Sequence, residues 1–181
     1  MTEISYRLAV PDDVPTINAV AARSIRALHK ESYDDAIINA AIEQAYGVDW
    51  QLVRDGTYFV AEMNGDIAGA GGWSHRETIA GSHGPDDLPG AGLNPMHDAA
   101  RIRAFYVDPV FARRGVGALL LRLSEDAARS AGFKKAELTS TLPAVPFYSR
   151  FGYNSVGVYS LPLNDGLSLT LELMTKLLAI S

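Results

Sequence analysis

The chain has no cysteine among its 181 residues, which excludes disulfides, thiolate zinc sites and a covalent thiol intermediate. It also lacks any apolar run near the roughly 20 residues that cross a membrane, and its N-terminus lacks a signal-peptide pattern. Basic residues are too few for a nucleic-acid-binding face, because 16 Lys and Arg against 21 Asp and Glu give a formal charge of −5. We therefore expect a cytoplasmic protein with no nucleic-acid or membrane partner, whose charge mildly favours cationic amine substrates.

Hydrophobic residues make up 48% of the chain, which suits one well-packed domain over 1–181 and is short for two. Apolar periodicity and turn residues predict alternating strands and helices. The expected elements are a strand over 6–9, helices over 14–28 and 34–45, a hairpin over 57–73 turning at Asn64-Gly65, a strand over 101–107, a helix from 116 to Gly132, a strand over 135–140, a short helix ending at Gly152 and a hairpin over 156–177. The strand, helix and strand between 101 and 140 predict a parallel pair with a right-handed crossover.

A polar segment over 74–99, rich in glycine, proline and aspartate, interrupts this pattern. Loops of this length are usually functional lids or mobile insertions. The segment contains His75, His83 and His97 near several aspartates, but no pair has the tight spacing of metal ligands. We expect surface histidines here and no metal site.

The stretch over 101–109 predicts a strand and a turn, and it leads into Arg113-Arg114-Gly115-Val116-Gly117-Ala118 at the start of the next helix. Glycines there let backbone N–H groups turn inward, and the helix start adds a positive dipole end, so the loop suits a pyrophosphate. The two arginines add cationic donors. A basic turn with two solvated arginines is the alternative. The Gly-Lys-Ser/Thr ending of a nucleotide-hydrolysing loop is missing, and Leu120 stands where a dinucleotide fingerprint has its third glycine.

A second segment, Pro146-Phe147-Tyr148-Ser149-Arg150-Phe151-Gly152-Tyr153, lies downstream. Together, the glycine loop with its preceding strand and this segment resemble the GNAT superfamily of acyl-CoA-dependent N-acyltransferases, and the resemblance covers most of the chain. It implies an α/β fold with a mixed, mostly antiparallel sheet, one splayed parallel strand pair, and helices on both faces. It also implies acetyl-CoA as the acyl donor, no metal, and direct attack of an amine on the thioester.

The resemblance implies roles for particular residues. The backbone amides of the loop, from Arg113, Arg114, Gly115, Val116, Gly117 and Ala118, would grip the coenzyme A pyrophosphate. The family's first loop position, usually glutamine or arginine, is Ala112 here, so a side-chain contact from that position is lost. The backbone of Phe105, Tyr106 and Val107 would pair with the pantetheine arm and offer an N–H to the thioester carbonyl.

Tyr148 matches the tyrosine that protonates the departing thiolate in this family. A phenol with a reference pKa of about 10 is protonated at neutral pH and can donate that proton. The alternative is a half-buried aromatic residue that packs with Phe147 and Phe151.

The general base has no clear candidate. The strand before the loop offers Arg101 and Arg103 where several family members have a glutamate, which leaves Asp98, His75 or Glu62 acting through water. Strand alternation places Arg101, Arg103, Phe105 and Val107 on one face.

Trp73 and Arg103 are candidate contacts for the acceptor. Arg103 would bind a substrate carboxylate or form a structural ion pair. The acceptor itself, a small molecule or a peptide amine, carries no signature. A non-catalytic acyl-CoA-binding domain is the alternative function, and exposed strand edges allow a homodimer.

Overall fold

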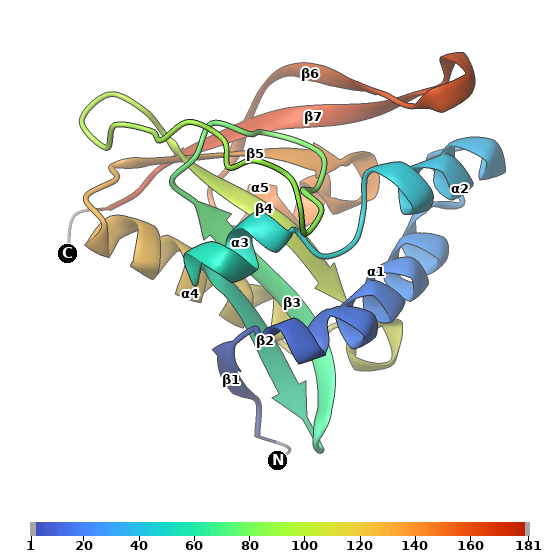
Figure 1. Ribbon diagram of the computed structural model, residues 1–181, viewed down its shortest axis with the longest axis horizontal. Coiled ribbons are helices and arrows are strands. Elements are labelled where there is room, and N and C mark those ends of the chain that lie inside the picture. Colours follow the sequence, from blue (N-terminus) through green and yellow to red (C-terminus); the bar gives the residue numbers. More distant parts are fainter. Residues whose placement is uncertain (1–2, 180–181) are drawn as a thin grey trace.

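A seven-stranded mixed sheet forms the centre of the computed structural model, which describes residues 3–179. The strands lie in the order β1-β2-β3-β4-β5-β7-β6 (Figure 1). Their bounds are Ser5–Leu8 for β1, Tyr58–Met63 for β2, Asp66–Ser74 for β3, Ala100–Val107 for β4, Lys135–Thr141 for β5, Asn154–Pro162 for β6 and Ser168–Leu177 for β7. Strands β4 and β5 are parallel, and the other neighbouring pairs are antiparallel. The predicted mixed sheet with one parallel pair is therefore confirmed.

Helices cover both faces of the sheet (Figure 1). They are α1 (Val14–His29), α2 (Asp35–Gln44), α3 (Trp50–Asp55), α4 (Val116–Ser130) and α5 (Val145–Arg150). Helices α1 and α3 bury apolar side chains against one face of β2 and β3, and α4 packs on the opposite face. No helix within 3–179 is long and apolar enough to cross a membrane.

The hairpin of β2 and β3 turns at the predicted dipeptide. Asn64 and Gly65 have φ angles of 56° and 86°, which are the left-handed values that a two-residue hairpin turn requires. A Cβ added at Gly72 would lie only 2.2 Å from the carbonyl oxygen of Thr57. A side chain therefore does not fit at Gly72, where the backbones of β2 and β3 approach closely.

A bulge in β4 overturns the predicted side-chain alternation. The register with β3 shifts between Ala70 and Gly72, and opposite this shift Ala104 has a φ of 55°. Phe105 and Val107 therefore pack with the core beneath α4, while Arg103 forms an ion pair with Asp49, the N-cap residue of α3 on the other face. The prediction that these β4 side chains share one face is wrong because a bulge reverses the alternation.

The buried face of α4 includes a carboxylate. Leu121 and Ala128 are buried, and so is Glu125. Both carboxylate oxygens of Glu125 lie 2.9 Å from Nζ of Lys176, and the Tyr153 hydroxyl donates to one of them. The buried carboxylate is tolerated because charged and polar partners surround it.

Candidate active site

The loop before α4 presents a row of backbone amides that have no acceptor in the protein. Arg113 and Gly115 have φ angles of 61° and 88°, and these two left-handed residues turn the chain into the helix. Across 3–179, no backbone or side-chain oxygen accepts a hydrogen bond from the N–H groups of 113–118. Residues 112–115 are exposed, so the amides and the positive end of the α4 dipole are open to an anion.

Asp108 fixes the position of this loop. Its carboxylate accepts a hydrogen bond from the Val110 amide, which caps the short turn Pro109–Phe111. It also pairs with Arg23 of α1 at 2.6 Å. One buried carboxylate thus holds the end of β4, the loop and α1 together.

Strands β4 and β5 diverge soon after they meet. Their pairing covers Ala100 with Ala136 and Arg101 with Glu137, and within the described chain it extends no further. Beyond that point β5 pairs only with β7, as far as Thr141. The edge of β4 over 105–107 therefore faces a gap in the sheet, where an extended ligand can form strand-like hydrogen bonds.

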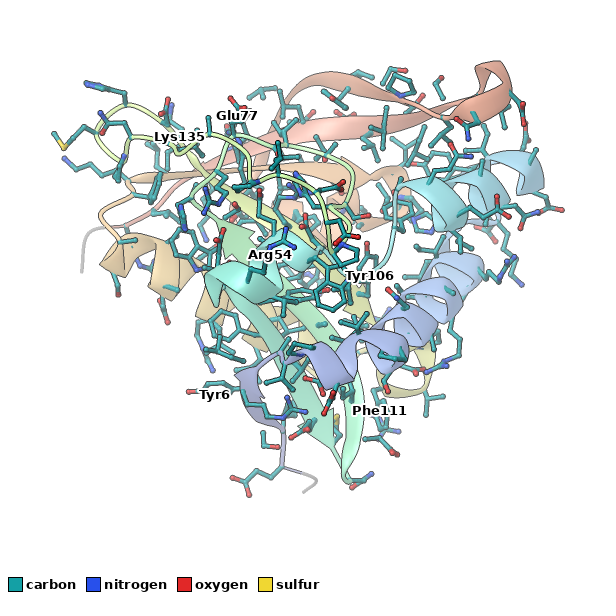
Figure 2. All side chains as sticks on the ribbon, viewed as in Figure 1. Tyr6, Arg54, Glu77, Tyr106, Phe111 and Lys135 are labelled. Carbon is teal, nitrogen blue, oxygen red and sulfur yellow. The ribbon has the colours of Figure 1, made fainter. Side chains whose placement is uncertain are left out.

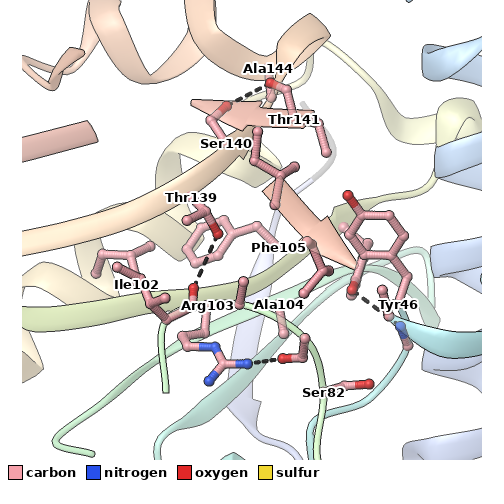
Figure 3. Close-up of a pocket in the computed structure, with 18 of the residues that line it drawn as sticks. Tyr46, Ser82, Ile102, Arg103, Ala104, Phe105, Thr139, Ser140, Thr141 and Ala144 are labelled. Atoms are coloured by element: carbon pink, nitrogen blue, oxygen red, sulfur yellow. Dashed lines mark hydrogen bonds between the residues drawn. The ribbon is translucent and has the colours of Figure 1, made fainter. Parts of the chain in front are cut away.

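A cavity of about 110 Å³ lies at this divergence (Figure 3). Its walls are Tyr46 with its neighbours after α2, residues 79–82 of the long polar segment, residues 102–106 of β4 and residues 139–141 of β5, and Tyr148 of α5 also lines it. No pattern in the sequence indicated that Tyr46 lines a cavity. For 139–141 a signal existed, because ligands commonly bind at the carboxyl ends of parallel strands.

Tyr148 lies on α5, which has Pro146 in its first turn and is followed by Gly152, whose φ is 91°. Its ring packs edge-on against Phe105 and Phe147, with centroid distances of 6.4 and 5.1 Å. Burial raises the pKa of Tyr148 above its ordinary value, and the nearby Tyr106 hydroxyl adds to the effect. The Tyr148 ring thus packs among aromatic neighbours, and its phenol is also protonated, as a general acid must be. The side chain lines the cavity.

The model of the "Acetyltransferase (GNAT) family" matches residues 22–153. The chain belongs to the GNAT acetyltransferase family. An uncharacterized N-acetyltransferase of Streptomyces avermitilis is 32% identical over 114 residues, which are 62% of this chain and 24% of that protein. The chain thus spans about a quarter of that relative's length.

Solved GNAT structures share the fold at low identity. A GCN5-related N-acetyltransferase from Rhodopseudomonas palustris aligns with a TM-score of 0.71 and 21% identity over 98% of both chains. The paia N-acetyltransferase of Thermoplasma acidophilum, solved with coenzyme A, aligns with a TM-score of 0.65 and 16% identity over 97% of this chain and 99% of that one. The putative acetyltransferase yncA of Salmonella typhimurium, solved with acetyl-CoA, aligns with a TM-score of 0.61 and 16% identity over 99% of this chain and 96% of that one.

Arg103 of this GNAT protein is held internally. Its guanidinium lies 2.9 Å from the Asp49 carboxylate, with side-chain exposures of 4% and 0%. It also donates to the carbonyl oxygens of Thr78, at 3.0 Å, and Gly81. Burial lowers the pKa of Arg103, and the charge of Asp49 opposes that shift. Of the two alternatives drawn from the sequence, the geometry matches the ion pair.

Asp49 and His83 are connected in a way that the sequence did not indicate. Besides Arg103, the Asp49 carboxylate accepts hydrogen bonds from Nδ1 of His83 at 3.0 Å and from the Gln51 amide at 3.0 Å. The prediction of a surface histidine is wrong for His83, which is half-buried, whereas His97 is exposed. This network fastens the polar segment over 74–99 to α3 and β4.

The remaining candidates lie outside the cavity lining. Trp73 packs edge-on against Phe133 at 5.9 Å, within the core beneath α4. Glu62 pairs with Arg7 at 3.0 Å, while Asp98 accepts a hydrogen bond from the Asn94 amide. His75 lies 3.8 Å from Asp55. Figure 2 displays all the side chains of the described residues and shows how densely they fill the space around the sheet.

Proposed function

We propose that the protein transfers an acetyl group from acetyl-CoA to the amine of a small molecule or peptide. The row of unpaired amides over 113–118, at the start of α4 and beside the gap between β4 and β5, carries this proposal. Family membership and the cofactor complexes of the solved relatives support it. A cytoplasmic location and a homodimer remain predictions.

In this proposal the amides of 113–118 and the side chains of Arg113 and Arg114 hold the diphosphate of acetyl-CoA. The pantetheine arm lies along the open edge of β4 over 105–107, and an N–H of that edge donates to the thioester carbonyl. A donor fixed at this position stabilises the oxyanion as it develops. Holding the thioester beside the cavity also brings the two reactants together.

The chemical step needs one acid and one free amine. The amine nitrogen attacks the thioester carbon, a C–N bond forms and the C–S bond breaks. The departing thiolate takes the proton of Tyr148, and the nitrogen loses a proton to solvent, from which Tyr148 is reprotonated. Tyr148 suits this role because burial keeps its phenol protonated at neutral pH.

One observation favours a second candidate, a domain that binds acyl-CoA without transfer. Among the described residues, those that line the cavity include no aspartate, glutamate or histidine that would act as a side-chain base. Release of free thiol from acetyl-CoA in the presence of a panel of amines separates the two candidates. Tight binding of acetyl-CoA with no thiol release would favour the second.

The loop is tested by the double substitution Arg113→Gln and Arg114→Gln. Both side chains are exposed, so the fold should persist, and loss of two charge-assisted contacts should weaken acetyl-CoA binding roughly tenfold or more. Isothermal titration calorimetry at fixed salt measures this. Arg122→Gln, an exposed site on α4 beyond the loop, is the matched control. Equal affinity in all three proteins would refute the loop assignment.

The acid is tested by Tyr148→Phe. We expect turnover to fall about 100-fold, because general acid catalysis typically contributes that much, while acetyl-CoA affinity stays nearly constant. The hydroxyl of Tyr148 makes no hydrogen bond within the described chain, so its loss should leave the packing intact. Tyr153→Phe is the control, because that hydroxyl bonds to Glu125 instead of lining the cavity. Unchanged turnover in the Tyr148 variant would remove this residue from the mechanism.

A further inference from the structure

The cavity offers no uncompensated charge to an acceptor. Among the described residues that line it, Arg103 carries the one side chain that is ionised at neutral pH. That charge is balanced by Asp49 at 2.9 Å, and two carbonyl oxygens accept hydrogen bonds from the same guanidinium. Neither a carboxylate nor a second ammonium group on the acceptor would therefore find a free counter-charge.

The polar groups of the cavity are hydroxyls, and several are already engaged. The hydroxyl of Thr139 donates to the Ile79 carbonyl at 3.1 Å, and that of Ser140 donates to the Thr141 carbonyl at 2.8 Å. Figure 3 shows both contacts. The Tyr46 hydroxyl is buried and has no partner within the described chain. It is therefore an unsatisfied neutral polar group on a side chain that lines the cavity.

Aromatic rings supply much of the remaining surface. Tyr46 packs edge-on against Tyr106, with ring centroids 6.1 Å apart, and Tyr148 packs edge-on against Phe105. All four rings line the cavity. Burial raises the pKa values of Tyr46 and Tyr148, so both phenols stay neutral. Such walls favour an apolar or aromatic body, because ring faces pack well against other rings.

The wall over 79–82 is fastened in place. Arg103 binds the carbonyls of Thr78 and Gly81, Thr139 binds that of Ile79, and the Trp50 amide donates to the carbonyl of His83. These bonds span the segment on both sides of the cavity lining. The uncharged residues 79–82 therefore form a fixed part of the cavity wall.

From these observations we infer that the acceptor is a small primary monoamine with an uncharged, aromatic body. This inference rests on the proposed function. A second charge that enters the cavity with the acceptor would lie there without a counter-charge, which is unfavourable. The same surroundings disfavour the ammonium form of the reacting group, so the nucleophilic amine forms although no side-chain base lines the cavity.

Matched acceptor pairs test the inference through thiol release from acetyl-CoA. The pairs are 2-phenylethylamine with phenylalanine and butylamine with 1,4-diaminobutane, which differ within each pair by one charged group. We expect kcat/KM to be roughly tenfold or more higher for the member without the second charge in both pairs, and highest for 2-phenylethylamine. Equal or higher values for phenylalanine or 1,4-diaminobutane would overturn the inference.

A variant with an added charge makes the test sharper. Thr141→Asp places a carboxylate in the cavity wall and should shift the butylamine to 1,4-diaminobutane ratio toward the diamine by roughly tenfold. Thr170→Asp, an exposed site on β7, is the control and should leave the ratio unchanged. An unchanged ratio in the Thr141 variant would contradict the assignment of this cavity to the acceptor.

Failure of the inference and failure of the proposed function give different results. If no amine releases thiol, the same pairs are titrated calorimetrically into the protein loaded with coenzyme A. Binding of 2-phenylethylamine without binding of phenylalanine would keep the cavity assignment and refute transfer alone. No binding of any amine would refute the inference.

Discussion

The ion pair between Asp49 and Arg103 should contribute strongly to stability, and Asp49→Asn tests this. Asparagine keeps the shape of the side chain and removes its charge. Arg103 would then be a buried cation with only carbonyl and amide oxygens around it. Removing one partner of a buried pair typically costs about 3 to 5 kcal/mol, because the other charge stays desolvated.

The expected loss can be stated as a change in urea unfolding. Asparagine still offers an oxygen to Arg103, so we take the lower value, about 3 kcal/mol. With an m-value of about 2 kcal/mol/M for a protein of this size, the unfolding midpoint should fall by about 1.5 M. Asp126→Asn is the control, because Asp126 is more than half exposed where it pairs with Arg129. An exposed pair contributes at most about 1 kcal/mol, so its midpoint should move by less than about 0.5 M.

A double variant separates charge from packing. Combining Asp49→Asn with Arg103→Met removes both charges and should recover part of the lost stability, because no buried ion is left unpaired. The reasoning is refuted if Asp49→Asn unfolds at the same urea concentration as the control. It is also refuted if the double variant is no more stable than Asp49→Asn alone.

Two further predictions concern the core. Gly72→Ala should lower the free energy of unfolding by roughly 1 to 3 kcal/mol, since the added Cβ would lie 2.2 Å from the Thr57 carbonyl oxygen. Calorimetric melting at matched protein concentration measures this, and an unchanged Tm would refute the prediction. Burial lowers the pKa of His29 below its ordinary 6.5, so the unfolded chain binds a proton at this residue more readily than the folded chain does. The free energy of unfolding should therefore rise with pH from about 5 to 7. His29→Gln should flatten that slope in urea unfolding series, and a slope equal to that of the natural chain would contradict this account.

Local signals predicted most of the elements correctly. Asn64-Gly65, Gly132 and Gly152 mark chain reversals that need left-handed backbone, and all three positions have positive φ angles. Helix α3 was missed. It spans only Trp50–Asp55, and its start depends on the Asp49 side chain accepting from the Gln51 amide. Periodicity cannot reveal so short a helix.

The errors at the site arise from contacts between distant residues. No local pattern indicates that Glu125 is buried, because its partners Lys176 and Tyr153 belong to the C-terminal hairpin region. Likewise, the burial of Arg103 depends on Asp49, which lies 54 positions earlier (103 − 49). Local sequence patterns point to the loop and Tyr148 as candidates, whereas the cavity wall around Arg103 depends on tertiary pairing that no local pattern reveals.

The bulge at Ala104 connects these local and distant features. An alanine with a φ of 55° is strained, and such strain persists only where the surroundings hold the backbone in place. The hydroxyl of buried Tyr58 donates to the Ala104 carbonyl at 2.8 Å and fixes it from the α1 and α3 side. The register shift then turns Phe105 toward Tyr148 and α4, while Tyr106 faces α1 and Tyr46. One strained residue, whose carbonyl accepts a hydrogen bond from Tyr58, thus sets which face of the sheet each following β4 side chain occupies.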